Sequence, residues 1–422
     1  MTADTEPARG RYRVFVRRAD LAILGEIDDF LTLTATKVYN DVGSWELSIS
    51  GTSAGADLLD PALNPAGGVV ISRDGVTFLT GPIDAFSDNW SDQDGENDVI
   101  TVSGTDDNLW LFGSLIYPDP AQTPEVMTTS YYRTASLAAE SIMRDLVLKN
   151  MGSSALAPRQ LDALVIPASL GRGRVQKSPK YRFDVLGVAL QQLSVLSQVG
   201  SDVTTQLMFS LQQEGLSLVF RVSNGAGKAS EVRFSKRLGT LRGYERTSQA
   251  PTATNLILGA GSEETPDDSS GVKIAKGLFS YERTDLDFPR RIEQFVDVGV
   301  IDPSNADTEL ELAELQEQLD QQAEDAFDSG AGQVGATIVP RETSQLAFGL
   351  DYTLGDFCTV ILPRLTFVER IREVELVLEV TSGETITLSI GTAEGSYQRR
   401  TRGAYRRIST LQHYIDRLKT GK

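Results

Sequence analysis

Cysteine and histidine each occur once among the 422 residues. The single cysteine, Cys358, excludes an internal disulfide framework and a cysteine-rich zinc site. The single histidine, His413, excludes a multi-histidine metal site, and a serine–histidine–carboxylate triad is possible only if it uses that residue. This composition points away from ordinary enzymes and favours a scaffold. We therefore expect no enzymatic activity, no cofactor and no metal site.

Long apolar runs and an excess of positive charge are also missing. No stretch approaches the roughly 18–20 apolar residues that a membrane helix needs, so we expect no membrane span. The first residues lack the apolar core of a classical signal peptide. With 40 basic and 58 acidic residues the net charge is −18, which argues against nucleic-acid binding as the main task.

Short runs of alternating apolar and polar residues dominate the beginning of the chain. Alternation at 13–17, 31–37 and 45–49, with glycine, aspartate and asparagine at the breaks, predicts antiparallel strands. The Arg-Asp-Gly triplet at 73–75 separates two further strand-like runs and has the composition of a hairpin turn. We predict that residues 1–115 form a small β-barrel or sandwich.

The next segment, 116–230, has a mixed pattern. Apolar residues three and four apart predict one helix capped by Thr134 and ending before Gly152, and a second helix over 183–199. A hairpin over 207–222 follows them. We predict that this segment is a compact α+β insertion.

Strand-like patterns return over 231–395, which we predict to be a second small β-domain. It includes a helix over 307–328 with nine acidic residues and no basic one. The apolar residues of this helix form one narrow stripe, made of Leu312, Leu315, Leu319, Ala323 and Phe327. An amphipathic helix with a solvated acidic face is the simplest interpretation. The alternative is that the acidic face lines something that it should repel.

The last segment, 396–422, inverts the charge. Between residues 397 and 422, eight basic residues accompany one acidic residue, a net charge of +7. Apolar residues recur there at the spacing of a coiled-coil seam, namely Ile408, Leu411, Ile415 and Leu418. Two heptads are too few for an independent coiled coil. We expect this helix or tail to dock on the acidic body of the same chain or of a neighbouring one.

Three short motifs suggest chemistry but lack the context that the chemistry needs. Residues 51–55 (GTSAG) match the nucleophile elbow, yet two prolines follow where a helix should support the serine. Residues 259–261 (GAG) lack the third glycine and the helix of a dinucleotide site. The run 92–98 (DQDGEND) departs from the spacing of an EF-hand loop and is typical of a hairpin tip, with cation binding as the sharper alternative.

A basic stretch, composed of Arg172, Arg174, Lys177, Lys180 and Arg182, stands out in the acidic chain. Such a cluster could contact phosphate, but a charge partner on another subunit is the preferred interpretation and an exposed loop is the simplest one. We name two groups of candidate oligomer or partner contacts. They are Arg172, Arg174, Lys177 and Arg182 in this stretch, and Ile408, Leu411, Ile415 and Leu418 in the terminal seam.

Several local patterns also follow one another in a characteristic order. They are NDVGSWEL at 40–47, RDG at 73–75 with TGPI at 80–83, RRIEQFVD at 290–297, YTLGDF at 352–357 and IREV at 371–374. Their succession over about residues 12–392 resembles the tail-hub (baseplate-hub-like) minor tail proteins of siphophages that infect actinobacteria. The chain departs from the pattern at Phe357 and Cys358, where a valine is usual. Its glycine-rich segment at 259–261 is shortened, and the basic tail lies outside the pattern.

The resemblance implies a homotrimeric hub built from two tube-like β-domains and an α/β insertion. Such a hub closes or continues the tail tube, carries fibres and lets DNA pass. From the strong negative charge of the chain we add the hypothesis that the lumen is negative, because a basic wall would bind phosphate tightly. The expected partners are a distal tail or tail tube protein, the tape measure protein, tail fibre or tip proteins and, transiently, the passing DNA. The expected location is the tail tip of the virion, after assembly in the host cytoplasm.

Two other functions stay open at this point. A tail-associated cell-wall-degrading or esterase-type hydrolase would need Ser53 and His413, or an unrecognised carboxylate pair, to converge. A carbohydrate-binding module for receptor attachment would need exposed aromatic residues, and the chain has only three tryptophans.

Overall fold

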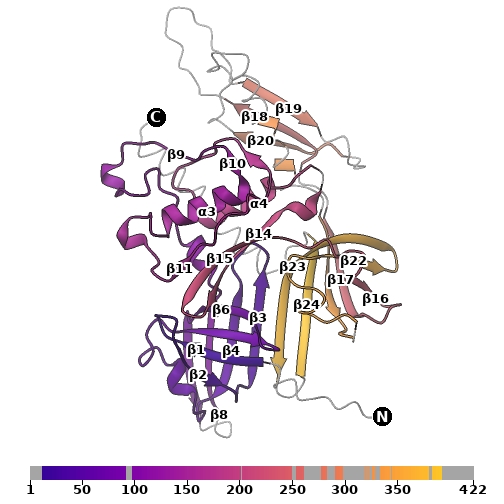
Figure 1. Ribbon diagram of the computed structural model, residues 1–422. Coiled ribbons are helices and arrows are strands. Elements are labelled where there is room, and N and C mark those ends of the chain that lie inside the picture. Colours follow the sequence, from indigo (N-terminus) through magenta and orange to yellow (C-terminus); the bar gives the residue numbers. More distant parts are fainter. Residues whose placement is uncertain are drawn as a thin grey trace, which may run out of the picture. The chain divides into compact units, whose positions relative to one another are not determined.

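The computed structural model describes residues 12–91, 97–200, 202–249, 253–260, 277–282, 290–297, 319–320, 323, 326–327, 333–343, 345–379 and 383–391. Strands dominate these residues, and the predicted mainly β class with an α+β insertion is confirmed (Figure 1). The chain divides into two compact units, Met1–Glu245 with Thr337–Gly391 and Arg246–Ala336 with Thr392–Lys422. In the first of these units, strands from the two ends of the chain share one sheet. The division into four segments stays a prediction.

The first sheet of the larger unit is a four-stranded antiparallel sheet. Its strand order is β2 (Ile23–Ile27), β1 (Tyr12–Arg17), β5 (Gly68–Arg73) and β6 (Val76–Pro82). Asp74 and Gly75 link β5 to β6 with φ angles of 51° and 77°. Positive φ at both central residues is the requirement of the tightest hairpin turns, which aspartate and glycine meet at low cost. The hairpin predicted at 73–75 is confirmed.

The long sheet of the larger unit joins the two ends of the sequence. Its main path runs β17 (Leu241–Gln249), β21 (Gln333–Pro340), β24 (Gly383–Gly391), β23 (Leu365–Glu379), β3 (Thr32–Val38), β4 (Ser44–Ser50), β8 (Asn97–Thr105) and β7 (Ala85–Ser91). Beside it, β22 (Phe357–Leu362) pairs with β23 and with β16 (Arg233–Ser235). The antiparallel pairing of β3 with β23 brings Leu33 opposite Leu378. The long sheet therefore contains strands from both segments predicted to be β-domains.

The insertion lies between β8 and β16 and is confirmed as mixed helix and strand. Its helices are α2 (Leu109–Phe112), α3 (Ala139–Asn150) and α4 (Leu186–Leu196), and α1 (Ala56–Leu59) lies earlier in the chain; short 3-10 turns cover Pro124–Val126, Ala157–Arg159 and Val203–Thr205. A three-stranded sheet has the order β11 (Leu164–Val165), β15 (Ser217–Asn224) and β14 (Leu207–Glu214). Two-stranded pairs form from β9 (Tyr132–Arg133) with β13 (Lys180–Tyr181) and from β10 (Leu137–Ala138) with β12 (Val175–Gln176).

Helices α3 and α4 pack on the core of the insertion. Ile142, Leu146, Leu190 and Leu193 pack with Phe209 and other residues of the sheet in one buried cluster. The helices are shorter than predicted. Helix α3 begins at Ala139 and not after Thr134, because Leu137 and Ala138 are engaged in the β10–β12 pair.

The smaller unit has a three-stranded sheet, with β18 (Asn255–Ala260) between β19 (Gly277–Glu282) and β20 (Glu293–Asp297). Residues 319–320, 323 and 326–327 are helical. Leu319, Ala323 and Phe327 are buried against Leu256 and Leu258, as the apolar stripe predicted for this helix. The remaining residues of 307–328 lie outside the described part of the chain. Within the described residues, no helix is long and apolar enough to cross a membrane.

Candidate functional site

The first sequence pattern of the resemblance, at 40–47, connects strands β3 and β4 of the long sheet to the insertion. Asn40 takes a left-handed backbone conformation, with φ of 53°. Its side chain accepts a hydrogen bond from the Phe209 amide at 2.8 Å and donates one to the Ser194 hydroxyl at 2.7 Å. A β-carbon on Gly43 would lie 2.3 Å from the Thr36 carbonyl oxygen, so only glycine fits. Residues of this pattern therefore fix the long sheet against the insertion.

Side chains, rather than another strand, cover the free edge of β14. The amides of Phe209, Leu211 and Gln213 donate to Asn40 Oδ1 at 2.8 Å, Asn108 Oδ1 at 2.7 Å and Thr80 Oγ1 at 3.0 Å. The three donors are two residues apart, as the edge of a strand requires. An uncovered edge would be open to pairing with another chain. Side chains from β6, from the β3–β4 connection and from the residues after β8 therefore fix the insertion to both sheets.

A buried ion pair lies beside these caps. Arg17 Nη2 and Nη1 contact the two carboxylate oxygens of Asp107 at 2.6 and 3.0 Å, and Nη1 also donates to Gln213 at 2.8 Å. Thr80 donates its hydroxyl to the same carboxylate at 2.5 Å. Asp107 is fully buried and Arg17 is 4% exposed. The pair therefore connects β1, the β8–α2 loop and β14 in a region without solvent.

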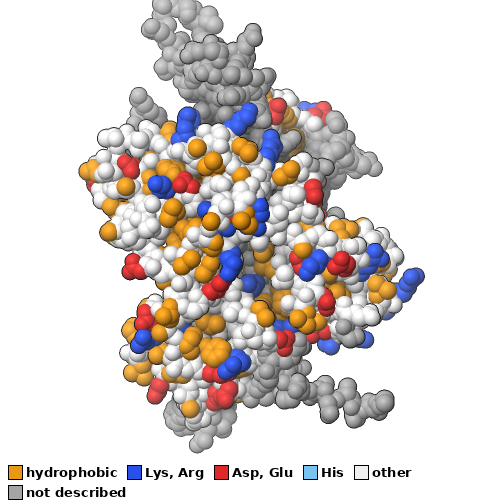
Figure 2. Space-filling view, in the orientation of Figure 1, with side chains coloured by type: hydrophobic (Ala, Val, Ile, Leu, Met, Phe, Trp, Pro, Cys, Tyr) orange, Lys and Arg blue, Asp and Glu red, His pale blue; other side chains and the backbone are white. Residues whose placement is uncertain are grey.

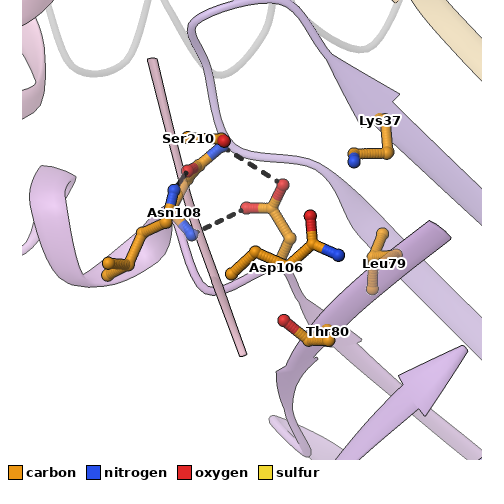
Figure 3. Close-up of a pocket in the computed structure, with 8 residues that line it drawn as sticks. Lys37, Leu79, Thr80, Asp106, Asn108 and Ser210 are labelled. Atoms are coloured by element: carbon orange, nitrogen blue, oxygen red, sulfur yellow. Dashed lines mark hydrogen bonds between the residues drawn. The ribbon is translucent and has the colours of Figure 1, made fainter. Parts of the chain in front are cut away.

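The neighbouring residue, Asp106, borders a small cavity with Lys37, Asn108 and Ser210 (Figure 3). The volume open to a water-sized molecule is about 10 Å³, which is room for about one water and not for a substrate. The Asp106 carboxylate accepts a hydrogen bond from the Asn108 amide at 3.1 Å. Burial raises the pKa of Asp106 to about 7, against the opposing effects of the Gly43 hydrogen bond and the Lys37 charge. Burial also lowers the pKa of Lys37.

We expect Asp106→Asn to stabilise the larger unit at alkaline pH. Because the folded pKa of about 7 exceeds the unfolded value, the native state binds the extra proton, and stability falls as pH rises through this window. The asparagine variant lacks this loss and should gain about 2–3 kcal/mol relative to the wild type between pH 5 and pH 8. Urea unfolding of both proteins at the two pH values measures the gain. If the difference in the free energy of unfolding between the two proteins is the same at pH 5 and at pH 8, Asp106 is not uncharged at pH 5.

Two later patterns of the resemblance also form structural joints. Arg73 of the RDG triplet, 5% exposed, contacts Glu384 at 2.7 Å and Glu342 at 2.8 Å and donates to the Phe348 carbonyl at 2.8 Å. It therefore ties β5 to β24 and to the loop before β22. Asp356 of the YTLGDF pattern contacts Lys228 at 3.1 Å. It also accepts hydrogen bonds from the amides of Ala226 and Thr353.

The surface of the long sheet that faces away from the core is polar over six adjacent strands. The register of the strands puts the following residues on this surface, which we call the polar face: Thr32, Thr34 and Thr36 of β3; Ser44, Glu46, Ser48 and Ser50 of β4; Ala85, Ser87 and Asn89 of β7; Val99, Thr101, Ser103 and Thr105 of β8; Glu373, Glu375, Val377 and Glu379 of β23; Thr385, Thr387 and Ser389 of β24. The alternate residues of β3, β4, β23 and β24 are mostly buried in the core, apart from the half-buried Lys37 and Glu384. The face is therefore built for contact with water or with a polar partner.

The charge of the polar face has one sign. Glu46, Glu373, Glu375 and Glu379 are its charged residues, and none of the residues that define the face is a lysine or an arginine. Burial, followed by the neighbouring charge of Glu375, raises the pKa of Glu373. Hydroxyl groups fill the space between the glutamates, as where Ser48 and Thr101 lie 3.2 Å apart. Chemically this surface repels anions, and its defining residues offer them no positively charged donor.

The basic stretch proves to have two parts. Arg172 is engaged inside its own chain, because its Nε and Nη2 contact the fully buried Glu140 at 3.0 Å each and Arg144 contacts the same carboxylate at 2.9 Å. Arg174, Lys177 and Arg182 are exposed. Their role as partner contacts stays a prediction. The terminal seam Ile408, Leu411, Ile415 and Leu418 lies outside the described residues.

The chemical motifs have structural explanations where the chain is described. The Ser53 hydroxyl donates to Asp29 at 2.8 Å and accepts from the Gly55 amide at 3.1 Å, which is ordinary turn geometry. Strand β18 continues through Gly259, where a β-carbon would clash with the Phe295 ring. Cys358 is fully buried, and burial raises the pKa of its thiol, which makes it unreactive.

The described residues contain no group of three histidine, cysteine, aspartate or glutamate side chains that could hold a metal ion. Residues 92–96 of the possible cation loop, and His413, lie outside the described part.

Two solved structures show which class of protein has this fold. The tail protein from Neisseria meningitidis MC58 is 16% identical, with a TM-score of 0.53, and the match covers 91% of this chain and 97% of that one. The 43 kDa tail protein of prophage MuSo2 from Shewanella oneidensis is 11% identical, with a TM-score of 0.55, and covers 90% and 98%. The fold is thus that of phage tail proteins.

The family follows from the sequence itself. The family model described as Siphovirus ReqiPepy6 Gp37-like protein matches residues 13–392, and the chain belongs to this family. The resemblance to siphophage tail proteins is confirmed, and the chain is a component of the phage tail. A comparison with curated proteins found no match.

Proposed function

We propose that the chain is the tail hub, a homotrimer at the tip of the virion tail that continues or closes the tail tube and carries the fibres. In this role it meets the distal tail or tail tube protein, the tape measure protein and the fibre or tip proteins. The family and the fold support a structural role in the tail. The joints described above support a rigid scaffold, since the motif residues link strands and do not converge on a reaction centre.

The observation that carries the proposal is the polar face of the long sheet. A channel for DNA must not bind phosphate, and every basic contact on its lining would slow passage. The polar face has four glutamates among short hydroxyl side chains and no cation among its defining residues. We infer that it lines the channel.

The two ends of the long sheet support assembly into a ring. Among the described strands, β7 and β17 stand at the two ends of the main path, and each is paired on one side. Unpaired strand edges favour contact with another chain. A contact between unlike edges of successive copies is heterologous, and three such contacts close a ring when the rotation is 120°.

Reversing the charge of the polar face tests this function. We expect the triple variant Glu46→Lys, Glu375→Lys and Glu379→Lys to bind duplex DNA that the wild type does not bind at the same salt concentration. Affinity should fall steeply with salt, with a log–log slope of up to about −2.7 for three phosphate contacts. Fluorescence anisotropy with labelled DNA measures both quantities. Phage carrying the variant should assemble and adsorb but release DNA more slowly.

The matched control replaces the same three glutamates by glutamine. This triple variant removes three negative charges and adds no positive charge. Phage that carry it should therefore release DNA at nearly the wild-type rate. Two results would overturn the proposal. One is equal DNA affinity of wild type and lysine variant, and the other is wild-type DNA release by phage that carry the lysines.

A further inference from the structure

A second cavity lies in the insertion, beside the C-terminal end of α3, and we call it the α3 pocket. The volume open to a water-sized molecule is about 280 Å³, close to the lower end, about 300 Å³, of the range for small-ligand pockets. Its lining is mainly apolar, and Pro118, Pro120, Ala121 and Tyr132 supply the apolar walls. The cavity therefore has room for one small ring-shaped molecule or for one unit of a longer chain.

The walls of the α3 pocket are fixed by the fold. The Tyr117 amide donates to Oδ1 of the buried Asn150 at 3.0 Å, so the loop that carries the two prolines is tied to the end of α3. The proline rings restrict the backbone of this loop further. On the other side, the Tyr132 hydroxyl donates to Asp145 of α3 at 2.5 Å. A ligand therefore meets a site that is largely formed before it binds.

Polar groups of both charges line the same cavity. Lys149 and Asp119 are the charged ones, and Thr129 and Ser154 add hydroxyl groups. In the part of the chain that the structure describes, neither the Lys149 ammonium nor the two hydroxyls have a hydrogen-bond or ion-pair partner. Asp119 Oδ1 accepts from the Ala121 amide at 3.2 Å, and Oδ2 has no partner among the same residues. Figure 2 shows a similar mixture of apolar and charged side chains over the insertion, on the face drawn.

This combination of groups selects the chemistry of the ligand. A phosphate or sulfate ion would pair with Lys149 but would meet the like charge of Asp119 in the same cavity. A purely apolar ligand would cover both charges without pairing them, which costs free energy. A sugar ring meets all the requirements. Its C–H face packs on the apolar walls, and its hydroxyl groups both accept from the ammonium and donate to the carboxylate.

We propose that the α3 pocket binds one pyranose unit of a glycan. Lys149 and Asp119 hold the hydroxyl groups along one edge of the sugar, and the ring of Tyr132 and the two prolines contact its C–H face. The binding goes beyond the hub function and does not depend on it. At the tail tip, the position proposed above, such a pocket would meet the polysaccharides of a cell surface.

Saturation-transfer NMR on the full chain tests the pocket. The probes are glucose, galactose, mannose and N-acetylglucosamine, each added as the free sugar. We expect at least one of them to receive saturation from the protein, with a Kd on the order of 1 mM, as for a ligand of about twelve heavy atoms. Preference for the acetamido sugar would indicate a cell-wall glycan strand, and preference for a hexose would indicate another surface polysaccharide.

Two substitutions separate the pocket from the rest of the surface. Ala121→Trp fills the cavity from an exposed position and should abolish saturation transfer. Lys149→Ala removes the ammonium and should weaken binding about tenfold. The matched controls are Ala62→Trp, at an exposed alanine outside the insertion, and Lys180→Ala, at an exposed lysine within it. Both controls should bind as the wild type does, and circular dichroism should be the same for all five proteins.

Three results would overturn the inference. The first is the absence of saturation transfer to any of the four sugars. The second is unchanged transfer in Ala121→Trp, which would mean that sugars bind elsewhere on the chain. The third is broadening of the phosphorus NMR line of inorganic phosphate by the wild type but not by Lys149→Ala, which would make the pocket an anion site. The DNA experiment above judges the hub function independently of all three.

Discussion

Asp107→Asn is expected to destabilise the larger unit by about 3–5 kcal/mol, the cost of removing one partner from a buried ion pair. The substitution keeps the shape of the side chain but leaves the Arg17 guanidinium, 4% exposed, without its counter-charge. It also weakens the acceptor that Thr80 and both Arg17 nitrogens share. Guanidinium unfolding at pH 7, followed by circular dichroism, measures the loss.

The matched control is Glu26→Gln at the exposed pair with Arg13. This pair is also bidentate, with distances of 2.8 and 2.6 Å, but its side chains are 32% and 56% exposed. An exposed pair contributes about 0–1 kcal/mol because water and salt screen it. If Asp107→Asn and Glu26→Gln lose comparable free energies of unfolding, burial is not what makes the Arg17–Asp107 pair important. Asp106→Asn, one position away, makes the same chemical change and is expected to act in the opposite direction at pH 8.

The strands and the first hairpin could be predicted because they are local features. Alternation marks β1, β3 and β4, since each has one buried face. The Asp74-Gly75 pair specifies its turn through the backbone alone. The helix start at Thr134 could not be corrected from local pattern, because β10 forms only when β12, about 40 residues later, is in place.

The joints could not be predicted, because they depend on contacts between distant positions. Asn40 caps the Phe209 amide 169 residues away, and nothing local distinguishes it from a surface turn residue. Arg73 reaches Glu384 across 311 positions. Asn40 and Arg73 belong to the sequence patterns that carry the family resemblance. The structure shows which contacts each of them makes. The polar face could not be predicted either. Its residues on β23 and β24 meet those on β3, β4, β7 and β8 only because β3 pairs with β23.

Arg172 shows how a charge cluster can mislead. Five cations within eleven residues look alike in the sequence, yet one of them is engaged with the carboxylate of Glu140, which is fully buried. Its neighbours stay on the surface. The signal that could have separated them is Glu140 itself, a charged residue on the apolar side of a predicted helix. A buried carboxylate needs a cationic partner.

Glu140→Gln is expected to destabilise the larger unit by about 3 kcal/mol at pH 7. Burial alone would raise the pKa of Glu140, but hydrogen bonds from Arg172 and Arg144 outweigh it and bring the pKa to about 2. Because the folded pKa is depressed, the stabilisation is complete above the unfolded value and is lost as pH falls towards 2. About 2 kcal/mol of it should already be gone at pH 3.

The measurement compares urea unfolding of wild type and Glu140→Gln at pH 7, 4 and 3. The gap between them should narrow as pH falls, since protonation removes from the wild type the charge that the variant never has. Glu214→Gln is the matched control, because Glu214 pairs with Arg221 through two contacts at the surface and should cost less than about 1 kcal/mol. A gap of constant size from pH 7 to pH 3 would mean that Arg172 and Arg144 do not hold Glu140 ionised. Arg172 would then be available for a partner, and the division between internal and exposed cations in segment 172–182 would fail with it.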